Sequence, residues 1–112
     1  MAKRKIKAPT SEYTSSEGDV LVLRGSMTPG TRREYADTFG GSPLSREDAW
    51  HRAVEFLFER LAVSWAVAGT DPLTRQKELL ARFRMASQTE RAWIRDVLRE
   101  HVAENFPDLS AP

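Results

Sequence analysis

The two histidines of the chain stand near carboxylates, the residue types that can support acid–base chemistry or hold a metal ion. Glu47, His51 and Glu55 are four residues apart, so they would share one face of a helix. A carboxylate-bridged metal site in a bundle needs a glutamate three residues before a histidine on each of two helices. Only Asp48 precedes a histidine by three residues, and it is an aspartate. We therefore expect no metal site and no cofactor.

Motifs of nucleophilic catalysis and of phosphate transfer are missing from the sequence. It contains no glycine-rich phosphate loop, no nucleophile elbow and no H-E-x-x-H pair. Arg24-Gly25-Ser26 could form a phosphate-binding turn, but an ordinary turn explains its single glycine. His101 fits a core histidine with one hydrogen bond. The sequence therefore predicts a non-catalytic protein and offers no catalytic residue.

Arginines form a row near the C-terminus. Arg91, Arg95 and Arg99 are four residues apart, so they would form one ridge of a helix, and a second ridge would carry acidic residues. Solvated flanks that pair with neighbouring helices would explain both rows. As a functional alternative, the arginines would form a docking edge for carboxylates of a partner or for phosphates.

A second basic group begins the chain, with Lys3, Arg4, Lys5 and Lys7. Together with a possible helix-turn-helix over residues 72–85 and 88–105, this cluster supports an alternative function, a nucleic-acid-binding regulator. The arginines of the last two helices would add to its basic surface. The acidic residues interleaved in the last helix count against this reading, because they would face phosphates.

The bulk composition restricts the number of domains, the classes of partner and the cellular location that we expect. The 112 residues suffice for one domain, and 17 basic against 16 acidic residues give a net charge of +1, so no global field favours an anionic partner. The absence of cysteine fits a reducing cytoplasm. No apolar run approaches the roughly 20 residues of a membrane span. We therefore expect a cytoplasmic protein without membrane contacts.

The pattern of caps and apolar residues predicts a mainly α-helical fold. Residues 1–18 read as a flexible basic and polar arm, and residues 19–112 as a single helical domain. Val20, Leu21, Val22 and Leu23 predict one short strand with no partner strand. Capping signals predict helices over 32–39, 46–68, 72–85 and 88–105, the last opened by a capping box at Ser87. A hairpin that pairs 20–23 with 33–39 is the alternative for the first helix. The expected architecture is a bundle of three to four helices preceded by the arm and one strand.

The long predicted helix has apolar residues on two sides. One broad stripe is the ordinary core face, and a second, narrow stripe contains Phe56, Val63 and Val67. Either the helix lies in the centre of the bundle, or the second stripe meets another chain. The unpaired strand at 20–23 also favours a partner that adds a strand. The leading hypothesis is a small protein-interaction module, an accessory or scaffolding subunit or a homo-oligomer, with these residues as its partner interface.

Overall fold

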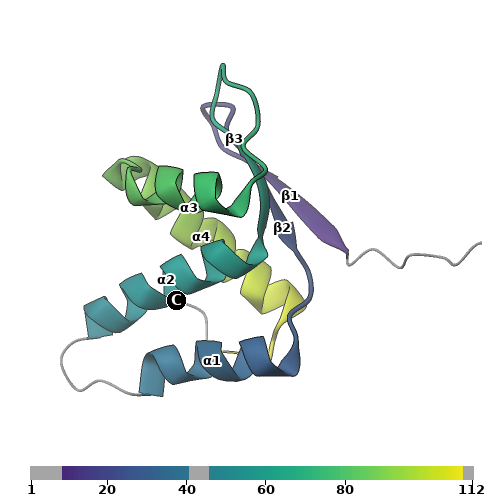
Figure 1. Ribbon diagram of the computed structural model, residues 1–112, viewed down its shortest axis with the longest axis vertical. Coiled ribbons are helices and arrows are strands. Elements are labelled where there is room, and N and C mark those ends of the chain that lie inside the picture. Colours follow the sequence, from purple (N-terminus) through teal and green to yellow (C-terminus); the bar gives the residue numbers. More distant parts are fainter. Residues whose placement is uncertain (1–8, 41–45, 110–112) are drawn as a thin grey trace, which may run out of the picture.

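The protein is a three-stranded antiparallel sheet with four helices, within residues 9–40 and 46–109, which the computed structural model describes. The strands are β1 (Thr10–Thr14), β2 (Val20–Arg24) and β3 (Ala62–Ala66). The helices are α1 (Pro29–Gly40), α2 (Arg46–Leu61), α3 (Gln76–Arg84) and α4 (Gln88–Asn105). The helices gather on one side of the sheet (Figure 1). The prediction of a mainly α-helical bundle with one strand is therefore wrong, because the fold is mixed α/β.

β2 is the central strand, so the apolar run that looked unpaired has a partner on each edge. β1 pairs with it on one side and β3 on the other, both antiparallel. Leu21 and Leu23 are completely buried, whereas Val20 and Val22 are half-buried on the opposite face, as the two-residue period of a strand requires. The expectation that this strand offers free backbone groups to a partner is therefore wrong.

β1 lies inside the segment that was predicted to be a flexible arm. Tyr13 is its inward aromatic residue and lies opposite Leu21. A tight connection leads into β2, in which the Ser15 N–H donates to the Asp19 carbonyl at 2.9 Å. Gly18 has a φ of +93°, a left-handed conformation that favours glycine. The arm prediction is wrong for residues 10–14. Residues 1–8, with Lys3, Arg4, Lys5 and Lys7, lie outside the described part of the chain.

The long helix predicted over 46–68 ends at Leu61, and the chain continues as β3. The pairing with β2 shifts by one residue at Val63, which is left as a β-bulge. Beyond the strand, the Ala68 N–H donates to the Asp19 carboxylate at 2.8 Å. This bond ties the end of β3 to the hairpin of β1 and β2. Residues 62–66 of the predicted helix are thus part of the sheet.

The predicted helix over 32–39 is confirmed as α1, and the alternative hairpin is wrong. The helix begins earlier than expected because Thr28 caps it: the Thr28 Oγ1 accepts the Thr31 N–H at 3.1 Å. Pro29 then occupies the first helical position, where its missing N–H has no cost.

The predicted helix over 72–85 is shorter than expected. Leu73 forms an isolated bridge with Trp65, and two backbone hydrogen bonds of 3.0 and 2.9 Å join them. α3 therefore begins only at Gln76. Asp71 and Pro72 precede this bridge and do not cap the helix.

The predicted helix over 88–105 is confirmed as α4, including its capping box. The Ser87 Oγ accepts the Glu90 N–H at 3.1 Å, and the Glu90 carboxylate accepts the Ser87 N–H at 3.0 Å. Burial raises the pKa of Glu90, but hydrogen bonds from Arg82 and Ser87 outweigh it and hold the pKa below its usual value.

None of the helices within the described ranges is both long and apolar enough to cross a bilayer.

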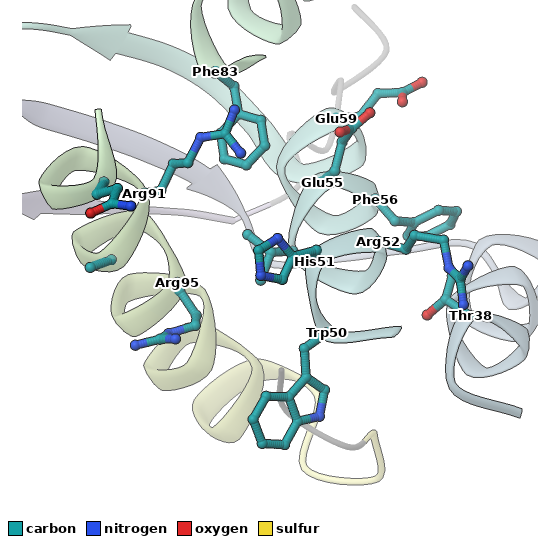
Figure 2. Close-up of a pocket in the computed structure, with 13 residues that line it drawn as sticks. Thr38, Trp50, His51, Arg52, Glu55, Phe56, Glu59, Phe83, Arg91 and Arg95 are labelled. Carbon is teal, nitrogen blue, oxygen red and sulfur yellow. The ribbon is translucent and has the colours of Figure 1, made fainter. Parts of the chain in front are cut away.

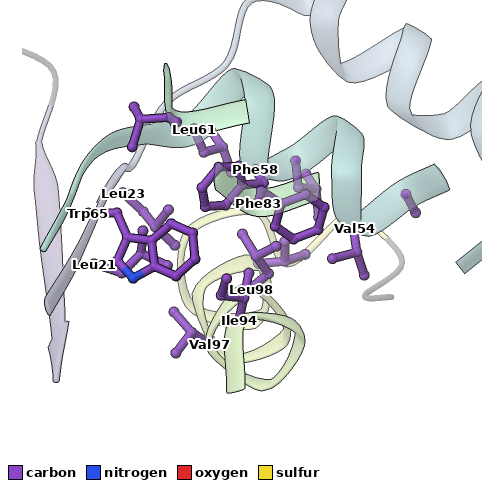
Figure 3. Packing of buried hydrophobic residues seen from close by; sticks show 14 of the residues in the cluster. Leu21, Leu23, Val54, Phe58, Leu61, Trp65, Phe83, Ile94, Val97 and Leu98 are labelled. Carbon is purple, nitrogen blue, oxygen red and sulfur yellow. The ribbon is translucent and has the colours of Figure 1, made fainter. Parts of the chain in front are cut away.

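The core lies between the sheet and the helices (Figure 3). Trp65 is at its centre, 0% exposed, with its ring edge-on to Phe58 at 5.7 Å and the Arg82 guanidinium 4.9 Å from its centroid. Phe58 also stacks on Phe83 of α3 at 4.7 Å. Aromatic contacts therefore join α2, β3 and α3 in one core.

Replacing Ser87 with alanine should lower the free energy of unfolding by about 1 kcal/mol, because it removes the hydroxyl that accepts the Glu90 N–H. Thr89→Ala, an exposed residue of the same helical turn, is the matched control and should change stability by less than about 0.5 kcal/mol. Urea denaturation followed by circular dichroism measures both. Equal stabilities of the two variants would show that the cap contributes nothing.

Candidate functional site

His101 has a structural position in the core. It is 0% exposed, and its Nε2 lies 2.6 Å from the Arg24 carbonyl oxygen, so it donates that bond. Its Nδ1 lies 2.8 Å from the Tyr13 hydroxyl and accepts from it in the neutral ring. These bonds link α4 to β1 and β2. The prediction of a core histidine is confirmed, with more than the one hydrogen bond expected.

His51 is exposed and lies on the outer side of α2. The side chains of Glu47 and Asp48, its proposed neighbours, lie outside the described residues. Among the side chains that are described, no group of three or more His, Asp or Glu residues is arranged to hold a metal ion.

A groove of about 910 Å³ runs along the outer face of α2, next to α4 and reaching α1 (Figure 2). We call it the α2 groove. It is lined by Thr38, Trp50, His51, Arg52, Val54, Glu55, Phe56, Glu59, Phe83, Gln88, Arg91, Ala92 and Arg95. Its size is at the upper end of ligand sites, and its shape is open.

Two aromatic side chains supply exposed apolar surface in the groove. Trp50 lies at one end and is 44% exposed, one of two large hydrophobic residues in the described chain with this much exposure. Phe56 is half-buried, with its ring 6.1 Å from that of Tyr35. Phe83 is nearly buried at 3% exposure and lies beneath the Arg91 guanidinium, 5.4 Å from its ring centroid. The lining of the groove therefore includes one nearly buried aromatic side chain, Phe83, and one exposed aromatic side chain, Trp50.

Arginines of α4 form one side of the groove. Arg91 is held in place by two backbone carbonyls, with Nη2 2.7 Å from the Arg84 oxygen and Nε 3.3 Å from the Ala86 oxygen. Among the described residues, the one ion pair of Arg95 is a 3.9 Å contact to the exposed carboxylate of Asp96 beside it. A surface pair of this length contributes little. Within the described residues, Arg91 has no carboxylate partner and Arg95 has a weak one, so the positive charge of both groups is not neutralised.

Carboxylates occupy the end of the groove opposite Trp50. Glu55 accepts from Nη2 of Arg84 at 2.7 Å and from Nε at 3.3 Å. The hydrogen bond with Glu55 raises the pKa of Arg84, and the charge of Glu59 acts in the same direction. The acidic end is thus partly neutralised by Arg84.

The groove is lined by three of the residues that the sequence predicted as interface residues, Phe56, Arg91 and Arg95, which had been assigned to two separate surfaces. Arg99 is exposed on α4 outside the groove. Val63 is the bulge of β3, and Val67 follows that strand and packs against the core. The remaining predicted interface residues, Val20, Leu21, Val22 and Leu23, belong to the central strand.

Sequence reasoning missed Trp50 and Arg52 as site residues and considered His51 only as a possible metal ligand. Helical periodicity puts Trp50 on the core stripe of the predicted helix, four residues before Val54. In the structure Val54 is buried, whereas Trp50 is 44% exposed. An aromatic residue so near the predicted start of a helix was the available signal.

No protein-family model matches this chain, and no significant similarity to a curated protein or to a solved structure is found. The functional interpretation therefore depends on the residues of the groove.

Proposed function

We propose that this protein is a small non-catalytic protein-interaction module and that a partner chain binds in the α2 groove. The observation that supports this proposal most is the combination of exposed Trp50 with Arg91 and Arg95 along one groove of about 910 Å³. Tryptophan and arginine are the residue types that most often dominate binding energy at protein interfaces. An exposed tryptophan next to further apolar surface is also unusual where nothing binds.

The alternative, a nucleic-acid-binding regulator, has less support from the positions of the arginines. Three arginines of the segment from 75 to 84 form intramolecular ion pairs: Arg75 with Glu78, Arg82 with Glu90 and Arg84 with Glu55. These carboxylates would repel phosphates at the same surface. We therefore favour a protein partner.

Trp50→Ala should abolish partner capture while leaving the fold intact, because the side chain is largely outside the core. The measurement is affinity capture from extracts of the native host with quantitative mass spectrometry, in comparison with wild type and with Met85→Ala. Met85 is 81% exposed and is not part of the groove, so it is a matched control. We expect a protein that wild type and Met85→Ala retain and Trp50→Ala loses about tenfold or more. Identical capture by all three would contradict the proposal.

A further inference from the structure

The length of the groove fits a short helix. Trp50 and Glu59 lie at its two ends on α2 and are nine residues apart, which corresponds to about 14 Å along the helix axis. A helix lying beside α2 would contact it over two to three turns. Its side chains at positions i, i+4 and i+7 would then face the groove.

Positive charge is concentrated on the wall of the groove that α4 forms. The Arg91 guanidinium lies 5.4 Å from the centroid of the Phe83 ring, and Arg95 follows one turn along α4 toward Trp50 (Figure 2). No carboxylate of the described residues forms an ion pair with Arg91. Arg91 and Arg95 are one turn apart on α4, about 6 Å along its axis. That spacing matches two carboxylates four residues apart on a second helix.

Negative charge at the end of the groove opposite Trp50 is partly neutralised. Glu55 is bound to Arg84, and Arg84 also lies in the field of Glu59. The complementary ligand therefore carries its acidic residues toward Arg91 and Arg95. Complementary potentials of this kind set the orientation of a partner and its rate of association.

We propose that the occupant of the α2 groove is an acidic amphipathic helix of a partner protein. This inference rests on the proposed function and names the chemistry of the partner. Apolar side chains of that helix contact Trp50, and carboxylates one turn apart contact Arg91 and Arg95. The basis is charge complementarity together with the length of the groove.

The test uses displayed random peptides of about 15 residues, near the shortest length at which isolated helices form. They are selected on the immobilised full chain, and the winning peptides are synthesised. Their affinities are measured for wild type, Arg95→Glu, Arg99→Glu and Trp50→Ala. Arg99→Glu makes the same charge change one turn along α4 but outside the groove, so it is the matched control. Circular dichroism checks that each variant is folded.

We expect selected peptides with apolar residues at helical spacing and with acidic residues one turn apart. Their affinity should fall about tenfold in Arg95→Glu and Trp50→Ala, and less than about twofold in Arg99→Glu. Neutral or basic peptides that need Trp50 but tolerate Arg95→Glu would overturn this inference and leave the proposed function standing. Failure to select any peptide that depends on Trp50 would overturn both.

Two other occupants of the α2 groove, a second copy of this chain and nucleic acid, would give different results. Light scattering that shows a dimer in wild type and a monomer in Trp50→Ala would overturn the acidic helix in favour of a second copy. Binding of a short DNA duplex that Arg95→Glu abolishes and Trp50→Ala leaves unchanged would overturn it in favour of nucleic acid.

Discussion

Trp65→Ala is expected to lower the free energy of unfolding by about 3–5 kcal/mol, a large part of the stability of a small domain. The side chain is 0% exposed and contacts Phe58 edge-on at 5.7 Å. Its backbone joins β3 to Leu73 through two hydrogen bonds, so a disturbed strand would also disturb the approach to α3. Removing the indole would leave a cavity where the sheet, α2 and α3 meet.

Two further variants make this expectation specific. Trp65→Phe should lose less than half as much stability, because a ring remains and the indole N–H is buried without a hydrogen-bond partner in the described structure. Met85→Ala, at a position 81% exposed, should change stability by less than about 0.5 kcal/mol. Urea denaturation followed by far-ultraviolet circular dichroism measures all three. A Trp65→Ala protein as stable as wild type would show that β3 does not cover the core.

His101→Leu should lower the free energy of unfolding by about 2–3 kcal/mol even though leucine is apolar and of suitable size. The substitution leaves the Arg24 carbonyl and the Tyr13 hydroxyl without their partners at 2.6 and 2.8 Å. Both groups are partly buried, so water can replace only part of what is lost. The ring also contacts Phe106 edge-on at 6.0 Å.

Tyr13→Phe separates the two hydrogen bonds. It removes only the hydroxyl and should cost about 1 kcal/mol, less than His101→Leu. Hydrogen exchange gives a second readout, because weakened contact between α4 and β1 should speed exchange in the first hairpin. If both variants unfold at the same urea concentration as wild type, the histidine does not hold the hairpin to α4.

Most of the helical part of the fold could be predicted from the sequence, because caps act locally. The Ser87 and Glu90 pair marked the start of α4, and its limits agree with the structure. α1 was also recognised, although it begins at Pro29, after its cap Thr28, rather than at residue 32. These signals depend on residues within one turn of each other.

The sheet could not be predicted in the same way, because its pairing is non-local. Ala62 to Ala68 fits a helical stripe, yet it also alternates small residues with Val63, Trp65 and Val67, which is the period of a strand. No glycine or proline separates this segment from α2. β1 was harder to recognise, because Tyr13 is its one large apolar side chain. Pairing with β2 determines both strands.

The candidate site was predicted only in pieces. The spacing of Arg91 and Arg95 identified a ridge of α4, and the second stripe of α2 identified Phe56. That the two surfaces form one groove depends on how α2 packs beside α4, and no local pattern encodes this. Trp50 was not recognised as a site residue, because periodicity shows which face of a helix a residue lies on but not whether a neighbouring element covers it there.

Site-specific photo-crosslinking in the native host tests the central claim most directly. A photoreactive benzoyl-phenylalanine is placed at position 50 in the α2 groove and, in separate proteins, at position 85 and at position 22 on the open face of the sheet. A partner in the groove predicts one dominant crosslinked protein at position 50, weaker when Arg95→Glu is added, and none at positions 85 and 22. Crosslinks to a partner protein at position 22 but not at position 50 would show that the partner binds the sheet. This result would contradict the proposal that it binds in the α2 groove.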